Sequence, residues 1–552
     1  MTIIDETTND VAKTGVSRRH FIQGAAATAA GAALPVAGIV GAGAASAATA
    51  KTLRIATGKQ LYPAAPWRTM DGSLFIIGAT GEWLCWQTPD FKLEPRIATS
   101  WKSSNGGKTW TFKIRQGVKF SDGTPLTVDD VVYTFQSVWN ATSLFTKKKH
   151  ASKGNFTGIM SGPNQVVKVD NETVRFDLDI AKGNFPYDVS SMSYGLCIIK
   201  NGVDGSDAWT KDMITAGPWK MTSYTEYEKT TFTKNPFYWD KDYNCGFDNL
   251  ELIQFTSAAT AIPQLKTGKL DVIGAMEAAD AAKIDKSKFD ITSLNVGAGL
   301  GHVHLRADFG PFKDKRVRQA AALTIDREGY VKGVMKGVGG LVGNDNVMTP
   351  YPDGAKSVAQ RKMDVAKAKE LMKAAGVPNG FSCDLSTWKR DDFDKYAQLI
   401  KTSFKKIGIN VTLKIDGSAG GNDVYYAGPY DSVKGKVLAY DNNSWMASTI
   451  GITDWAGRGV PDQYLMREYH SAGDWNDAHI WDDSLDAAIS AYLGAMTPAK
   501  KKETAKKIAE ISLDLTPYIL AYTSNAIGVR RKGLTGINAN GMGQYNLKGA
   551  KG

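Results

Sequence analysis

Two histidines in alternate positions are the first candidates for metal chemistry. On a β-strand, His302 and His304 would point to the same side of the sheet, where both imidazoles could hold one ion. A zinc site needs at least three protein ligands. No other His or Cys lies near this pair in the sequence, and His470 and His479 are remote. We therefore predict that the protein holds no metal and no other cofactor.

The other sequences that resemble catalytic motifs each lack a required residue. Gly107-Lys108-Thr109 has the end of a phosphate-binding loop, but Lys102 stands where the loop needs its first glycine. Gly297, Gly299 and Gly301 miss the final spacing of a dinucleotide fingerprint and instead predict a bend. No Gly-x-Ser-x-Gly sequence is present. We predict that the protein is not an enzyme; the alternative is an exported metal-dependent hydrolase that uses the histidine pair.

The N-terminus has the layout of a twin-arginine signal peptide. The residues that carry this signal are Ser17, Arg18, Arg19, Phe21 and Ile22. The stretch that follows has no Asp, Glu, Lys or Arg before Lys51, and it ends in the small-x-small pattern of Ala45 and Ala47, after which we place the cleavage. A membrane anchor is the alternative, but a spanning helix needs about 20 strongly apolar residues, and this stretch is mostly Ala and Gly.

No cysteine follows that stretch, so a lipid anchor is not indicated. We expect the twin-arginine translocase to export a soluble protein that is free in the periplasm. Without residues 1–47 the chain is still too long for one core, which predicts several domains. Its net charge of +11 is spread along the chain, and the densest basic run, 147–149, has no aromatic residue within it to stack on bases. We predict a monomer that binds no nucleic acid.

The four cysteines, at 85, 197, 245 and 383, form no C-x-x-C motif. Buried free thiols are one interpretation, and a disulfide between Cys85 and Cys197 is the other, because an oxidising compartment would permit it. The sequence also predicts mixed α and β structure. Alternating apolar residues indicate a strand at 109–114, helical spacing indicates helices at 128–138 and 368–375, and Thr497-Pro498 begins another helix.

Several segments carry a family resemblance in a fixed order. They read PRIATSW at 95–101, GKTWTF at 107–112, IRQGVKFSDGTPLT at 114–127, AGPW at 216–219, KNPFYW at 234–239, LKTGKLD at 265–271 and PFKDKRVRQA at 311–320. The chain thus resembles the extracellular solute-binding proteins of family 5, which are the dipeptide, oligopeptide and nickel receptors of ATP-driven (ABC) importers. The resemblance spans nearly the whole chain after the signal peptide.

That resemblance implies an α/β fold, a two-lobed periplasmic binding protein of type II that is similar to cluster C and has an extra inserted domain. It assigns residues 48–80, 225–302 and 512–552 to lobe I, residues 81–224 to the inserted domain II and residues 303–511 to lobe II. It also implies a function: capture of a peptide or peptide-like solute between the two lobes, and its delivery to an ABC permease in the inner membrane.

The resemblance also directs attention to the segment that begins at Trp455. In the peptide-binding members an acidic residue follows a tryptophan and pairs with the α-amino group of the ligand, but here Arg458 stands about where that residue would be. A guanidinium repels an ammonium and offers two parallel donors to a carboxylate or phosphate. The alternative ligand is therefore a non-peptide anionic solute, such as an opine or a sugar phosphate. Arg458 could instead face solvent or pair with Asp454 or Asp462.

Two further groups are candidates for the walls of the binding site. Trp388, Arg390 and Asp391 lie roughly where the peptide receptors place an arginine and an acidic residue, although such a run of charges also fits a solvated loop. Tyr440 and Trp445 lie in a stretch that is rich in Asn and Ser and could line a pocket, with a place in the core as the alternative.

Overall fold

The computed structural model describes residues 50–552, and these residues form one compact unit. Gaps in the description lie at 59–60, 62–72, 141–155, 157, 194–195, 204–211, 256, 295–298, 355, 418–431, 434–435, 438–443, 474 and 541–542. The signal-peptide residues from Ser17 to Ala47 and the candidate Tyr440 lie outside the described residues. Among the helices that are described, none combines the length and the apolar composition that crossing a bilayer requires.

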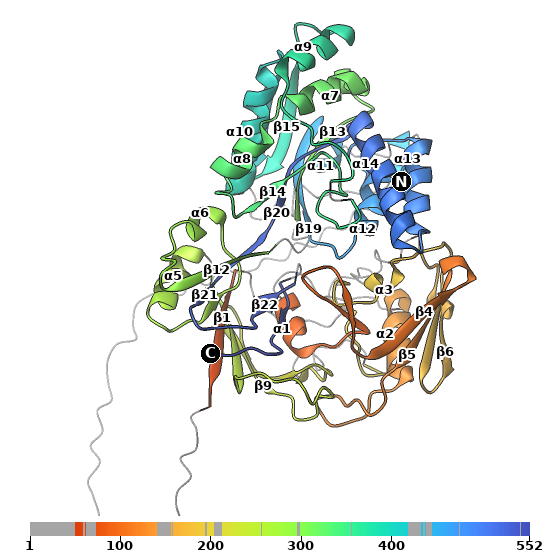
Figure 1. Cartoon of the computed structure of the whole chain (residues 1–552), viewed down its shortest axis with the longest axis vertical. Coiled ribbons are helices and arrows are strands. Elements are labelled where there is room, and N and C mark those ends of the chain that lie inside the picture. Colours follow the sequence, from red (N-terminus) through yellow and green to blue (C-terminus); the bar gives the residue numbers. More distant parts are fainter. Residues whose placement is uncertain are drawn as a thin grey trace, which may run out of the picture. The chain divides into compact units, whose positions relative to one another are not determined.

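A seven-stranded sheet joins strands from both ends of the chain. Its order is β12-β21-β11-β1-β10-β9-β8, and β1 runs parallel to both of its neighbours. The strands are β1 (Thr52–Thr57), β8 (Trp219–Thr225), β9 (Lys229–Lys234), β10 (Asn249–Gln254), β11 (Val272–Ile273), β12 (Phe289–Leu294) and β21 (Ala526–Arg531). The neighbouring elements are α1 (Ser73–Thr80), α5 (Ala258–Lys266), α6 (Ala278–Ala281), β22 (Asn538–Ala539) and β23 (Tyr545–Asn546) (Figure 1).

A six-stranded sheet has the order β14-β20-β13-β19-β15-β16. Its strands are β13 (Gly299–Leu305), β14 (Gly340–Val342), β15 (Ser382–Trp388), β16 (Asn410–Asp416), β19 (Ile450–Ala456) and β20 (Tyr518–Ser524). The helices of this part are α7 (Lys315–Leu323), α8 (Arg327–Gly333), α9 (Val365–Ala374), α10 (Asp391–Lys405), α11 (Ser444–Ala447), α12 (Asp462–Tyr464), α13 (Asp483–Leu493) and α14 (Pro498–Leu515), with a π-helix at Leu465–Tyr469. In Figure 1, α13 and α14 pack side by side.

A four-stranded antiparallel sheet, in the order β4-β5-β7-β6, forms a third core with α2 (Val128–Asn140). Its strands are β4 (Ala98–Ser104), β5 (Thr109–Ile114), β6 (Val166–Asp170) and β7 (Thr173–Asp177), and nearby lie β2 (Cys85–Gln87), β3 (Leu93–Pro95) and α3 (Phe185–Asp188). Phe112 packs edge-on against Phe176, which does the same with Phe135 of α2. The predicted strand at 109–114 and the predicted helix at 128–138 are confirmed.

Helix beginnings follow the expected chemistry. The Thr497 side chain accepts from the Lys500 amide, and Pro498 begins α14, because a proline needs no backbone donor in the first turn. The predicted bend at the glycines is wrong in part: Gly299 and Gly301 lie in β13, whereas residue 297 is outside the description. Gly301 fits there because a Cβ atom would lie 2.4 Å from the Tyr522 ring.

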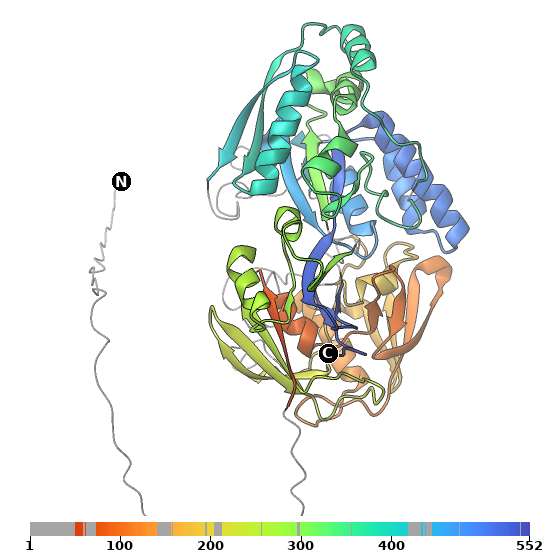
Figure 2. The same cartoon turned by 60° about the vertical axis from the view of Figure 1, so that its left-hand side comes forward.

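Two connections join the seven-stranded and six-stranded sheets. One runs from β12 to β13, and the other from β20 to β21 through the single residue Asn525. The Asn525 side chain donates to the Ser293 hydroxyl at 2.9 Å and to the Val338 carbonyl at 3.2 Å, so it ties both connections together. Figure 2 shows β20 and β21 as the long blue ribbon that runs from one sheet into the other. The predicted domain boundaries stay a proposal; by sheet membership, β8 groups with lobe I and β20 with lobe II.

All four cysteines are free thiols, so the structure does not contain the disulfide that was considered between Cys85 and Cys197. The two residues belong to different hydrophobic clusters: Cys85 packs with the four-stranded sheet, and Cys197 packs with the seven-stranded one. Burial raises the pKa of both thiols, that of Cys197 to about 12, so neither is a reactive thiolate at neutral pH.

Candidate functional site

The segment from Trp455 to Tyr464 contacts the end of β2, which is far away in the sequence. The Gln87 side chain, at the end of β2, donates to the Gly459 carbonyl at 3.2 Å. A Cβ atom on Gly459 would come within 2.1 Å of the Gln87 side-chain oxygen and 3.1 Å of Met192 Cγ. The absence of a side chain at Gly459 thus allows two parts of the chain, far apart in sequence, to touch directly at this point.

Arg458 is buried within that contact, with 5% of its surface exposed, so the alternative in which it faces solvent is wrong. One guanidinium nitrogen donates to the Gly457 carbonyl at 3.2 Å, and the guanidinium carbon lies 5.9 Å from the centre of the Tyr464 ring. The Tyr351 hydroxyl donates to the Arg458 carbonyl at 3.1 Å. Arg458 therefore places a buried positive charge beside the Tyr464 ring.

Asp462 makes its short contacts with two residues that directly precede α3. Its carboxylate accepts from Lys182 Nζ at 2.9 Å and from the Asn184 amide at 2.9 Å. Lys182 also lies 3.2 Å from Asp188, and all of these side chains are buried. Sequence patterns did not indicate this charged group, because Lys182 and Asp462 are 280 residues apart.

The two aspartates of this group, Asp188 and Asp462, differ in their pKa values. Burial raises the pKa of Asp188 to about 7 despite the attraction of Lys182. Burial acts in the same direction on Asp462, but Lys182, Lys501 and Asn184 outweigh it and lower the pKa of that carboxyl below its usual value. Near pH 6 the group therefore holds one ion pair, Lys182 with Asp462, beside a protonated Asp188.

Trp388 and Arg390 form a separate cluster at the start of α10. The Arg390 guanidinium stacks 3.6 Å from the Phe393 ring centre, lies 5.6 Å from the Trp388 ring centre and pairs with Asp392 at 2.6 Å. Trp388 is buried, and the Arg390 side chain is about one third exposed. The backbone of Asp391 begins the helix, while its side chain lies outside the description. Lys389 and Arg390 lie in the short connection between β15 and α10, so a place for this run in the binding site stays a prediction.

Trp445 and Trp455 are both buried and meet edge-to-face, with 5.8 Å between their ring centres. Trp455 also packs 6.0 Å from the His302 ring, and the Trp445 indole nitrogen donates to Asp477 Oδ2 at 2.8 Å. The structure thus brings these two predicted residues together in the interior of lobe II, beside the histidine pair.

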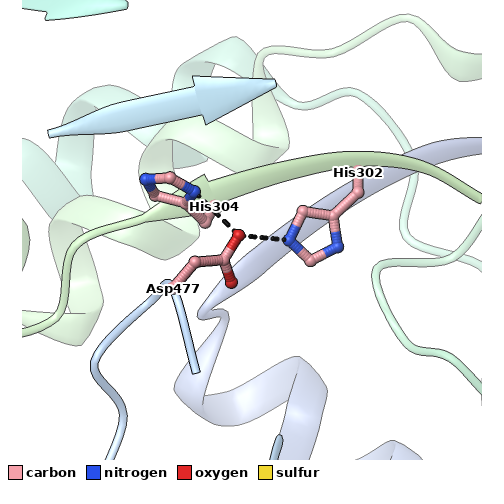
Figure 3. A group of neighbouring side chains, drawn as sticks. All are labelled: His302, His304 and Asp477. Atoms are coloured by element: carbon pink, nitrogen blue, oxygen red, sulfur yellow. Dashed lines mark hydrogen bonds and ion pairs between the residues drawn. The ribbon is translucent and has the colours of Figure 1, made fainter. Parts of the chain in front are cut away.

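The histidine pair has a partner that the sequence did not indicate. His302 and His304 lie on the same face of β13, as predicted, and both approach Asp477 Oδ2, at 3.0 Å and 2.9 Å (Figure 3). All three side chains have no exposed surface. Burial acts to raise the pKa of Asp477, but the two histidines outweigh it and hold this pKa well below its usual range. Asp477 is thus a buried anion.

Comparison with known proteins identifies the architecture. A model of the bacterial extracellular solute-binding proteins, family 5 Middle, matches residues 92–475. The chain belongs to this family. A second model, of the twin-arginine translocation pathway signal sequence, matches residues 15–35, which confirms the predicted signal peptide and a periplasmic location. The cleavage after Ala47 stays a prediction.

Relatives and solved structures agree with this assignment. Di/tripeptide-binding protein 1 of Pseudomonas aeruginosa is 25% identical over 457 residues, which cover 77% of this chain and 80% of that protein. The ABC transporter substrate binding protein CtaP from Listeria monocytogenes has a TM-score of 0.74 at 21% identity, covering 91% and 99% of the two chains. AgaA in complex with agropinic acid, from A. tumefacien R10, has a TM-score of 0.69 at 21% identity, covering 91% and 98%. The predicted two-lobed α/β fold is confirmed, and this family 5 protein is a solute-binding protein of an ABC importer.

Proposed function

We propose that this family 5 protein captures a peptide or peptide-like solute between its lobes and delivers it to an ABC permease in the inner membrane. The relative from Pseudomonas aeruginosa, named as a di/tripeptide-binding protein, supports the solute class. The contact of Gly459 with Gln87 supports a site beside Arg458, because a solute bound next to this contact would be enclosed by two separate parts of the chain. Closure of two lobes around a solute gives a permease a shape that differs from the empty one. Export by the twin-arginine translocase moves the protein across the inner membrane into the periplasm, where it can meet the permease.

Arg458 favours a solute that carries an anionic group. Its buried guanidinium would repel the α-ammonium of an ordinary peptide and would bind a carboxylate or phosphate with charge-assisted hydrogen bonds. AgaA, which was solved with agropinic acid, supports the view that this fold accepts such a solute. The second candidate function is therefore reception of a non-peptide anionic solute, such as an opine or a sugar phosphate.

Calorimetry of the protein without its signal peptide tests both functions. The panel contains di- and tripeptides, N-acetylated and C-amidated forms of any peptide that binds, opines, sugar phosphates and Ni²⁺. If Arg458 holds an anionic group, acetylation of the α-amino group changes affinity little, whereas amidation of the carboxylate weakens it. Capture of the peptide N-terminus would give the reverse result. If no solute in the panel bound but a metal-dependent hydrolysis appeared, the receptor function would be wrong.

The variant Arg458→Ala locates the site. Loss of one partner from a buried charge pair costs about 2–5 kcal/mol, so we expect at least a ~30-fold loss of affinity. Arg316→Ala is the matched control, because Arg316 is an exposed arginine of α7 that pairs with Asp314. Equal affinities of wild type and Arg458→Ala would show that the solute binds elsewhere.

A further inference from the structure

The cluster of His302, His304 and Asp477 has the geometry of a cation site. Their ligand atoms all lie within 4.8 Å of one another, and they come from one strand and from the loop between the π-helix and α13. A tetrahedral zinc ion with bonds of about 2.0–2.1 Å holds its ligand atoms about 3.3 Å apart. The two imidazole nitrogens here lie 3.0 Å and 2.9 Å from Asp477 Oδ2. These two distances would lengthen by only a few tenths of an ångström to admit an ion, and the two imidazole nitrogens lie within 4.8 Å of each other.

The outer contacts of both imidazoles point to the same conclusion. The second nitrogen of His304 lies 3.0 Å from the Ser448 carbonyl oxygen, and the second nitrogen of His302 lies 3.4 Å from a Glu468 carboxyl oxygen. His304 therefore faces oxygen acceptors at both nitrogens, although a neutral imidazole carries only one N–H, and among the described residues the outer nitrogen of His302 has no hydrogen-bond partner. With a cation inside the cluster, each ring would donate its N–H outward and give its lone pair to the ion. Histidines that bind metals are usually held in this way.

The Ser448 hydroxyl does not relieve this shortage of donors. It lies 3.3 Å from the same His304 nitrogen, but it donates to the Trp445 carbonyl at 2.9 Å. The carbonyl of the same residue thus remains the acceptor that the outer nitrogen of His304 faces.

Glu468 gives an independent observation. Its carboxyl group has no exposed surface, and among the described residues neither of its oxygens has a hydrogen-bond partner. Burying a polar group without a hydrogen-bond partner is costly. A cation held by the inner nitrogens would leave the outer N–H of His302 directed toward this carboxyl group, 3.4 Å away.

We propose that His302, His304 and Asp477 bind one divalent cation of the Zn²⁺ class as a resident structural ion of lobe II. Two imidazoles with one carboxylate suit such a cation, whereas Ca²⁺ and Mg²⁺ prefer oxygen ligands alone. A fourth position would go to the second oxygen of Asp477 or to a water molecule. The ion would fasten β13 to the loop before α13. His302 packs on Trp455, so the ion would also support the segment that carries Arg458.

Metal analysis of untagged protein without its signal peptide tests the site independently of any solute. We expect close to one equivalent of a transition metal after gel filtration. After removal of that metal by a chelator, we expect added Zn²⁺ to raise the melting temperature by ~3 °C or more. Less than ~0.1 equivalent of metal, with no shift on adding Zn²⁺, would overturn the proposal and would mean that protons satisfy the cluster.

Two variants locate the ion. His304→Gln removes a ligand and should abolish both the metal content and the shift. His479→Gln is the control: His479 is also buried, but its Nδ1 contacts Asp308 rather than Asp477, so this variant should keep the ion. Retention of a full equivalent by His304→Gln would place the ion elsewhere. If His304→Gln does not fold, the Zn²⁺-dependent shift of the wild type still decides the question.

Discussion

Replacement of Lys182 by methionine should destabilise the protein strongly. Lys182 Nζ lies 2.9 Å from Asp462 and 3.2 Å from Asp188, and 1% of its side chain is exposed. At an effective dielectric constant of about 20, two unit charges 2.9 Å apart attract each other by about 6 kcal/mol. Desolvation offsets part of this, and loss of one partner from a buried pair typically costs about 3–5 kcal/mol. Because Lys501 also acts on Asp462, we expect the lower end of that range.

Urea unfolding at pH 6, followed by circular dichroism and tryptophan fluorescence, measures this loss. The control is Lys200→Met, since Lys200 makes a partly exposed pair with Asp122 at 3.2 Å, which should contribute less than about 1 kcal/mol. Adding Asp462→Asn to Lys182→Met should restore about 2 kcal/mol or more, because the orphaned buried charge is then gone. A loss below about 1 kcal/mol in Lys182→Met, or no recovery in the double variant, would refute the reasoning.

Three other outcomes follow from the structure. Asp188 has a folded pKa of about 7 against an ordinary 3.8, so it binds its proton more tightly when folded, and the stability that this provides is lost as pH rises from about 4 to 7. In urea unfolding, the free energy of unfolding of Asp188→Asn should therefore rise relative to that of wild type across this pH range. A difference that stays constant with pH would contradict this. Ellman's reagent should find four thiols in urea and none of the three buried ones in the native protein, whereas a disulfide would leave fewer in urea. Gly217→Ala should lower the melting temperature, because its Cβ would lie 2.3 Å from the Thr80 carbonyl oxygen, whereas Gly333→Ala in α8 meets nothing within 4 Å and should not.

The sequence predicted the local elements and the family, because both depend on short-range patterns. Alternation of apolar residues is enough to place the strand Thr109–Ile114, and Thr497 with Pro498 is enough to place the start of α14. The seven motif segments then predicted the two-lobed fold through the family resemblance. Such patterns depend on a few neighbouring residues, so they can be recognised without knowledge of the tertiary structure.

The groups that carry charge in the interior could not be predicted in this way. Asp477 is 175 residues from His302, and Lys182 is 280 residues from Asp462. Their meeting depends on how separate sheets pack, for which the spacing of residues holds no signal. The burial of Arg458 has the same origin, since it results from the approach of Gln87 and Tyr351 from elsewhere in the chain.

The positions of β20 and β21 in their sheets also determine how far synthesis of the chain must proceed before these sheets can form. β20 lies between β14 and β13, and β21 lies between β12 and β11, so each lobe takes an interior strand from the last part of the chain. A nascent chain still held at residue 517 would have a gap in both sheets. Neither sheet can be completed until β20 and β21 have been synthesised, because strands so distant in sequence cannot pair before both have emerged. A ribosome that stops before β20 therefore releases a chain in which both of these sheets are incomplete, rather than one finished lobe and one unfinished lobe.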